Sequence, residues 1–196
     1  LKTAISDLEV DQREMNSKIY YIKYPIDKSS EFITIATTRP ETMLGDTAIA
    51  VNPKDKRYKS FVGKTVTIPI VGRKIKIIKD NYADPEQGTG ALKITPAHDF
   101  NDYDVGQRNK LAIINVFTEE GKINDNAPKN YVGLDRFDAR KKILNELKEK
   151  DYFVKEENIK NKVPYGDRSN SIIEPYLTEQ WFVDAKTLAI KAKEVV

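Results

Sequence analysis

Apolar and polar residues alternate along short stretches in the first half of the chain. These stretches are rich in β-branched and aromatic residues and are bounded by glycine or proline, which is typical of β-strands. We predict strands at Lys18–Tyr24, Glu31–Thr38, Thr47–Val51, Thr65–Ile70, Arg73–Ile78 and Gly90–Thr95. Strands this closely spaced favour a barrel or a compact sandwich.

Further along the chain the apolar spacing becomes helical. The clearest example is Arg136–Lys150, where apolar residues form one stripe and lysines and glutamates lie opposite. We also predict a helix from about Asp99 to Lys110, a strand at Ala112–Phe117, a strand-like piece at Tyr152–Glu157 and a short helix near the C-terminus. The predicted fold class is therefore α+β, dominated by β-structure, with a barrel-like core and peripheral helices.

Length, charge and composition narrow the class of protein. A chain of 196 residues suits one domain with appendages. The formal charge of +3 permits a nucleic-acid partner without requiring one. The absence of cysteine excludes disulfides, thiolate nucleophiles and sulfur-based zinc sites. With no signal-peptide pattern and no long apolar run, we expect a cytoplasmic protein without a membrane segment. Because the chain begins with Leu1, we expect it to be part of a longer protein.

The segment "ITPAHDFNDYD" contains the only histidine, His98, close to Asp99 and Asp102. These three residues could in principle bind a metal, but a single histidine without cysteines is weak support, and we predict no metal site. No serine lies in a G-x-S-x-G context that would suit a catalytic triad. Asp99 and Asp102 could form an acidic capping box at a helix start, or present two carboxylates to an ammonium group and a hydroxyl. The segment alone leaves both interpretations open.

A second segment, "ATTRPETMLGD", gathers several hydrogen-bonding side chains. Thr37, Thr38, Arg39 and Thr42 place three hydroxyls and a guanidinium within six residues. Such a set suits an ester carbonyl, a ribose or a phosphate, although threonines at a strand end and an arginine before proline are also common in solvated turns. The "GTG" at Gly88–Gly90 predicts a tight turn into a strand rather than a phosphate loop, because no G-x-x-x-x-G-K-[ST] pattern is present.

The two segments together, "ATTRPETMLGDTAIAV" and "GTGALKITPAHDFNDYDVG", resemble the editing domain inserted into class I aminoacyl-tRNA synthetases, the valyl type in particular. The leucyl type typically continues D-T-L-F-G after its T-T-R-P theme, and the isoleucyl type has a T-T-x-P-W-T pattern. "LKTAISDLEV" and "VPYGDRSNSIIEPYLTEQWFV" resemble the valyl segments on either side of the insertion. The implied layout is a linker from the parent catalytic domain at 1–15, the editing domain at 16–162 and a return segment at 163–196.

The resemblance implies hydrolysis of threonine wrongly attached to tRNA(Val), by direct attack of water and without a cofactor or metal. It implies that Asp102 holds the α-ammonium of the aminoacyl group. The remaining roles are side-chain recognition or water orientation by Lys93, Thr95 and Asp99, and binding of the terminal adenosine and ester by Arg39, Thr38 and Thr42. The implied partners are the threonine-bearing 3′ end of tRNA(Val) and the remainder of the parent synthetase, and we expect a monomer.

Two alternatives and two departures accompany this interpretation. The domain could be a tRNA-docking module without catalysis, or an editing domain of leucyl or isoleucyl type. Gln87 stands where valyl relatives usually carry an aromatic residue, which puts detailed selectivity in doubt. Asn109 replaces a common histidine, with little expected effect on the chemistry. Neither ATP-binding signature of the class I synthetases is present, so we expect no aminoacylation by this chain.

Overall fold

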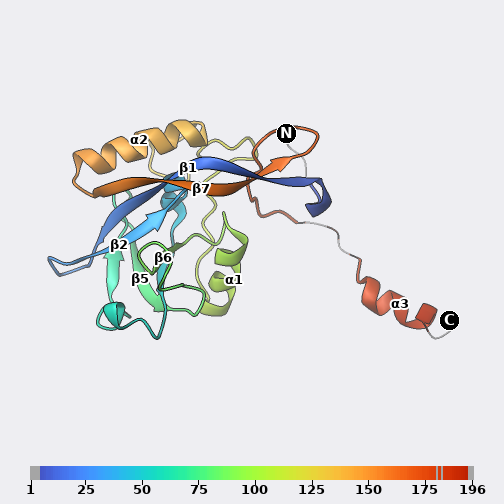
Figure 1. The fold of residues 1–196 in the computed structure, drawn as a ribbon, viewed down its shortest axis with the longest axis horizontal. Helices are drawn as coiled ribbons and strands as arrows, with labels where there is room; N and C mark the ends of the chain where they lie inside the picture. Colours follow the sequence, from blue (N-terminus) through green and yellow to red (C-terminus); the bar gives the residue numbers. More distant parts are fainter. Residues whose placement is uncertain (1–4, 180, 182, 194–196) are drawn as a thin grey trace.

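The computed structural model describes residues 5–179, 181 and 183–193. It confirms a mixed α and β fold in which sheets predominate. Strands β1 (Val10–Pro25), β2 (Phe32–Thr37) and β7 (Phe153–Gly166) form an antiparallel sheet in the order β2-β1-β7. Helix α2 (Arg136–Glu149) lies along the β1–β7 side of this sheet (Figure 1).

A second sheet lies on the other side of the first (Figure 1). Its strands are β3 (Ala48–Val51), β4 (Thr65–Thr67), β5 (Lys74–Lys79) and β6 (Ala91–Ile94), in the order β4-β5-β3-β6. Strands β3 and β5 are parallel, and the other pairs are antiparallel. An isolated bridge between Ile26 and Val66 joins the two sheets. Within the described part of the chain no closed barrel is seen.

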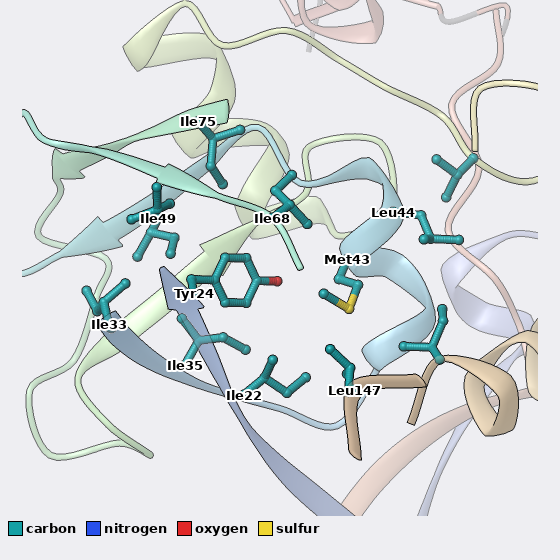
Figure 2. Close-up of a cluster of buried hydrophobic side chains, with 14 of the residues drawn as sticks. Ile22, Tyr24, Ile33, Ile35, Met43, Leu44, Ile49, Ile68, Ile75 and Leu147 are labelled. Atoms are coloured by element: carbon teal, nitrogen blue, oxygen red, sulfur yellow. The ribbon is translucent and has the colours of Figure 1, made fainter. Parts of the chain in front are cut away.

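The main core lies between the two sheets, because each contributes one apolar face. At the end of β1, Ile22 and Tyr24 point inward while their neighbours are only half-buried. Figure 2 shows Tyr24 at the centre of this cluster, surrounded by aliphatic side chains from both sheets, by Met43 and Leu44, and by Leu147 of α2. Met43 and Leu44 come from the short 3-10 helix η2 (Pro40–Gly45), every residue of which is buried.

A smaller cluster covers the opposite face of the second sheet. It consists of Ala48, Ala50, Ala83, Ile94 and Val105, the last from helix α1 (Phe100–Asn109). Strand β3 is therefore buried on both faces, with the main core on one side and α1 on the other. This packing fixes the start of α1 next to the end of β6.

The remaining elements are short or peripheral. They are the 3-10 helices η1 (Asp7–Glu9) and η3 (Lys56–Tyr58), and helix α3 (Ala185–Lys193), which lies apart from both sheets in Figure 1. None of the helices in the described residues has the length and apolarity to cross a membrane.

Most predicted elements are confirmed, but the strand expected at Ala112–Phe117 is wrong. Residues 111–116 have no regular structure, and only Phe117 forms an isolated bridge, with Ile123. Side chains, rather than a partner strand, bind backbone groups at the end of this segment: the N–H of Val116 donates to the side chain of His98 at 3.0 Å, and the carbonyl of Asn115 accepts from the Asn124 side chain at 3.0 Å. The strand expected at Tyr152–Glu157 is longer than predicted, because β7 pairs with β1 as far as Gly166. The divisions expected at residues 15 and 162 consequently fall inside β1 and β7.

Candidate functional site

The candidate site lies where β6 ends and α1 begins, beside the end of η2. Lys93 and Thr95 come from β6 and its C-terminal end, and Asp99 and Asp102 come from the first turn of α1. Asp46 directly follows η2. A close approach between these segments requires Gly45, because a Cβ atom there would lie 2.7 Å from the carbonyl oxygen of Ile114 and 3.3 Å from Cγ2 of Thr95.

Lys93, Thr95 and Asp46 form a buried hydrogen-bonded cluster. The Lys93 ammonium lies 3.2 Å from Oδ1 of Asp46, and the Thr95 hydroxyl donates to the same oxygen at 2.6 Å. Lys93 also donates to the Thr95 hydroxyl. The second carboxylate oxygen of Asp46 accepts from the Tyr24 hydroxyl at 2.7 Å. Asp46 is fully buried, and such a charge is tolerated only when it is paired and hydrogen-bonded in this way.

Asp102 is the second buried carboxylate of the cluster. Its Oδ2 atom accepts the backbone N–H of Thr95 at 2.8 Å. Burial raises the pKa of Asp102 to about 6, although the nearby Lys93 ammonium acts in the opposite direction. Repulsion from Asp99 and Asp46 adds to the increase. Burial also raises the pKa of Asp46, again against the pull of Lys93. Titratable groups perturbed in this way are common at functional sites.

Asp99 has a different environment from Asp102. It is exposed, and its Oδ1 atom caps α1 by accepting the backbone N–H groups of Asn101 at 2.9 Å and Asp102 at 3.0 Å. Asp102 occupies the third helical position, as predicted, but its carboxylate accepts from Thr95 rather than returning to the cap residue. The capping box is therefore only half formed, and the carboxylate of Asp102 faces the buried cluster.

His98 connects the start of α1 to the segment at Val116 and Phe117 through a hydrogen bond and a ring contact. Its Nε2 atom accepts the N–H of Val116, and its ring lies 4.5 Å from that of Phe117. Burial, with the nearby Arg39 and Lys93 charges, lowers the pKa of His98 to about 3, so the ring is neutral. Among the described residues no group of three or more histidine, aspartate or glutamate side chains is placed to hold a metal ion.

Besides Asp46, the threonine-rich segment brings Arg39 close to the cluster. Its Nη1 atom donates to the backbone carbonyl of His98 at 3.1 Å, which places the guanidinium next to the start of α1. The Thr42 hydroxyl is buried and donates to the carbonyl of Arg39 at 3.0 Å, so it stabilises η2. Thr38 is half-buried between β2 and η2.

The "GTG" turn brings its backbone against the end of β2. Gly88 and Gly90 both have positive φ angles, of 57° and 78°, as expected for a tight turn. A Cβ atom at Gly88 would lie 2.9 Å from that of Ala36. Tyr82 is 40% exposed, and its pKa is raised by burial and by the charges of Asp99 and Asp102. Tyr82 also lines a surface hollow of about 620 Å³ together with Lys79 and Arg108.

The structure adds residues that the sequence analysis did not single out. Asp46 is the acceptor at the centre of the buried cluster, and Tyr24 is its buried donor. Asp46 stands in the quoted segment "ATTRPETMLGD", and an aspartate after glycine in an otherwise apolar stretch was the available signal. Glu174, which contacts Arg39, lies 135 residues away in sequence and had no such signal.

Comparison with known proteins identifies the family. A family model described as the editing domain of leucyl-tRNA synthetase matches residues 55–136. Valine–tRNA ligase of Pelagibacter ubique is 82% identical over the whole chain, which covers 22% of that protein. The same enzyme of Thermotoga maritima is 53% identical over the whole chain, again covering 22% of the relative. The chain belongs to the valyl-type editing domains of the aminoacyl-tRNA synthetases.

This valyl-type editing domain thus corresponds to a small part of its curated relatives. It covers 24% of the Caulobacter vibrioides valine–tRNA ligase, with which it is 52% identical. A solved structure shares the fold. It is a leucyl-tRNA synthetase of Agrobacterium radiobacter K84, in a ternary complex with tRNA and LeuAMS. It matches with a TM-score of 0.56 and 22% identity, covering 75% of this editing domain and 20% of the synthetase chain.

Proposed function

We propose that this editing domain hydrolyses the ester that joins threonine to mischarged tRNA(Val). The observation that carries the proposal is the buried cluster of Lys93, Thr95, Asp46 and Asp102 at the start of α1. It combines an ammonium group, a hydroxyl and two carboxylates at positions that match the family motif. A buried site of this polarity suits a polar aminoacyl group far better than an aliphatic one.

The chemistry of the two amino acids explains why such a cluster would select threonine. Threonine carries a hydroxyl where valine carries a methyl, and a hydrophobic synthetic pocket discriminates poorly between them, a difficulty for which valyl enzymes are the standard illustration. A polar pocket reverses the preference. Valine would leave buried hydrogen-bonding groups unpaired, and this is costly, whereas the threonine hydroxyl can pair with them.

The proposed roles follow from the position of each group. Asp102 binds the α-ammonium, because its carboxylate is buried and has only one positive neighbour in the cluster, Lys93. Lys93 and Thr95 recognise the threonine side chain, supported from behind by Asp46. Asp99 is exposed at the helix start, where its second oxygen could orient a water molecule.

Arg39, Thr38 and Thr42 form the proposed wall for the terminal adenosine and the ester. Arg39 contributes a guanidinium that is 29% exposed, and Thr38 contributes a half-buried position beside it. Thr42 contributes indirectly, because its hydroxyl supports the backbone of Arg39. A wall of this kind positions the ester for attack without taking part in bond making.

In the proposed reaction, a water oxygen attacks the ester carbonyl carbon, the bond to the ribose oxygen breaks, and the water proton passes to that oxygen. The products are threonine and a free ribose hydroxyl. None of the proposed site residues is a strong nucleophile, so positioning and electrostatic stabilisation carry the acceleration, with help from the neighbouring ribose hydroxyl.

The test is deacylation of threonyl-tRNA(Val) and valyl-tRNA(Val) by this chain at high concentration, with Asp102→Ala measured in parallel. We expect loss of threonine but not of valine, abolished by the substitution. Equal loss of both amino acids would refute the selectivity and point to Gln87. If neither is hydrolysed while tRNA still binds, the chain is a docking module and the hydrolase proposal fails. The threonine-bearing 3′ end and the parent synthetase are the proposed partners.

A leucyl or isoleucyl specificity is the less supported alternative. The matching family model is of the leucyl type, but it covers only residues 55–136. The valine–tRNA ligases match the whole chain, including both flanks. Including tRNA(Leu) and tRNA(Ile), each charged with a non-cognate amino acid, in the same assay would reveal such a specificity directly.

A further inference from the structure

Arg39 is held in place by three separate acceptors. Its Nε atom donates to Glu41 at 3.3 Å, Nη1 donates to the carbonyl of His98 at 3.1 Å, and Nη2 donates to the carboxylate of Glu174. A guanidinium has five N–H groups in a rigid plane, so these contacts fix its orientation and leave two N–H groups available.

Two of these acceptors belong to the scaffold of the domain. The His98 carbonyl precedes α1, and Glu41 lies in η2, where it is buried and paired with Arg140 of α2 at 2.7 and 2.8 Å. Glu174 is different, because it comes from the irregular segment that follows β7. That segment is the expected return toward the parent catalytic domain.

Glu174 is itself anchored on α2. Its Oε2 atom accepts from Nη1 of Arg136 at 3.1 Å, and Nη2 of Arg136 donates to the carbonyl of Ile172 at 3.2 Å. The backbone N–H of Ile173 donates to the carbonyl oxygen of Pro164 in β7 at 2.9 Å. The segment therefore docks on β7 and α2 and presents one carboxylate to Arg39. The Glu174 side chain is only 14% exposed, so this ion pair is largely shielded from solvent.

The charges of this network explain why the carboxylate matters. Three arginines and two glutamates give a net charge of +1 when all are ionised. Without Glu174 the net charge is +2, and Arg39 and Arg136 lose the carboxylate that they share. The guanidinium groups of Arg39 and Arg136 would then repel each other in a partly buried environment, and Arg39 would turn toward solvent.

We propose that Glu174 is a positioning residue that fixes the Arg39 guanidinium at the editing site, so that the site is complete only when the segment around Glu174 is docked. The position of the return segment thereby controls the editing site. The consequence for catalysis rests on the proposed hydrolase function, whereas the effect on the orientation of Arg39 does not.

The first arm of the test measures the orientation of Arg39 without a substrate. The chain is labelled with an arginine-directed dicarbonyl reagent, and the rate at each arginine is read by peptide mass spectrometry. In Glu174→Gln, which keeps the shape but removes the charge, we expect labelling of Arg39 to increase several-fold. Arg140, held by Glu41, serves as the internal reference and should be unchanged. Glu174→Asp, which retains the charge, should restore part of the protection.

The second arm measures deacylation of threonyl-tRNA(Val). Loss of an oriented charged contact to the substrate should raise KM on the order of tenfold in Glu174→Gln, with a smaller change in kcat. The matched control is Glu146→Gln, which removes a glutamate of α2 that is 21% exposed and paired with Lys150. This control should leave KM and Arg39 labelling unchanged.

Each outcome decides the proposal. Unchanged labelling of Arg39 in Glu174→Gln overturns it, as does a decrease in KM, which would make Glu174 a plug that competes with substrate. Equal effects of the Glu174 and Glu146 substitutions would mean a general structural role and also overturn it. If the wild-type chain hydrolyses nothing, the proposed function fails, and the labelling arm alone decides whether Glu174 positions Arg39.

Discussion

Replacing Asp102 by asparagine should make the domain more stable while abolishing the proposed editing activity. The pKa of the carboxyl is raised from an ordinary value of 3.8 to about 6, chiefly by burial. A shift of about two units corresponds to about 3 kcal/mol by which ionised Asp102 destabilises the folded state. Asparagine removes the charge and retains an oxygen that can accept the N–H of Thr95. Since the amide is also desolvated, we expect a net gain of about 1–3 kcal/mol at pH 7.5.

The stability gained by Asp102→Asn should decrease as the pH falls. The folded-state pKa of Asp102 lies above its unfolded value, so the cost of ionisation is fully present above about pH 6. It decreases as the pH falls and is absent below about pH 4, where the carboxyl is protonated in both states. Urea unfolding followed by circular dichroism at pH 7.5 and at pH 4.5 measures both values for the wild type and the variant.

Asp99→Asn is the matched control, because it makes the same chemical change three residues earlier. Asp99 is exposed and caps α1, and asparagine caps a helix about as well as aspartate. This variant should therefore change the free energy of unfolding by less than about 0.5 kcal/mol. A loss of stability in Asp102→Asn at pH 7.5, or a gain that stays constant down to pH 4.5, would refute the argument that the ionised carboxylate is costly at this position.

The proposed deacylation should also depend on the ionisation of Asp102, but it should be lost at low pH, where the cost of ionisation disappears. If Asp102 binds the α-ammonium as a carboxylate, deacylation of threonyl-tRNA(Val) should decline as the pH falls through about 6. A rate that stays constant between pH 7.5 and pH 5 would argue against this role for Asp102.

Three further substitutions test the packing around the site. Tyr24→Phe removes a buried donor to Asp46 and should cost about 1–3 kcal/mol in urea unfolding; no loss would mean that the hydroxyl does not stabilise the carboxylate. Gly88→Ala introduces a Cβ atom 2.9 Å from that of Ala36 at a positive φ angle. It should lower the melting temperature, through a cost of about 1–2 kcal/mol, and slow deacylation. Leu147→Ala, in the core on α2, should cost about 2–5 kcal/mol without changing the pH at which deacylation declines.

The elements that could be predicted from the sequence are those whose pattern is local. The apolar stripe of α2 and the cap of α1 by Asp99 depend on residues within one or two turns, and both are found. The alternation in β1 likewise specifies which of its side chains face the core. The motif resemblance named Lys93, Thr95 and Asp102 as site residues; the structure places them together, and their role in editing stays a proposal.

The missed features depend on contacts between distant segments. The apolar content of Ala112–Phe117 is that of a strand, but the segment is held by the side chain of His98. The length of β7 follows from pairing with β1, since most residues from Phe153 to Gly166 are exposed or half-buried and give no clear apolar signal. Glu174 reaches Arg39 only because β7 returns the chain past α2. Periodicity within one segment carries no information about such partners.

The charges of the buried cluster suggest what it is built to receive. Lys93 carries one positive charge, whereas Asp46 and Asp102 together carry two negative charges when ionised. Burial of these carboxylates raises the pKa of both when no substrate is bound. An α-ammonium group placed beside Asp102 would balance the charge and would also favour the ionised carboxylate that binds it. Valine and threonine both carry this group, so charge balance attracts either aminoacyl ester. In the proposed site, selection between them would then depend on the hydroxyl, which we propose that Lys93 and Thr95 recognise.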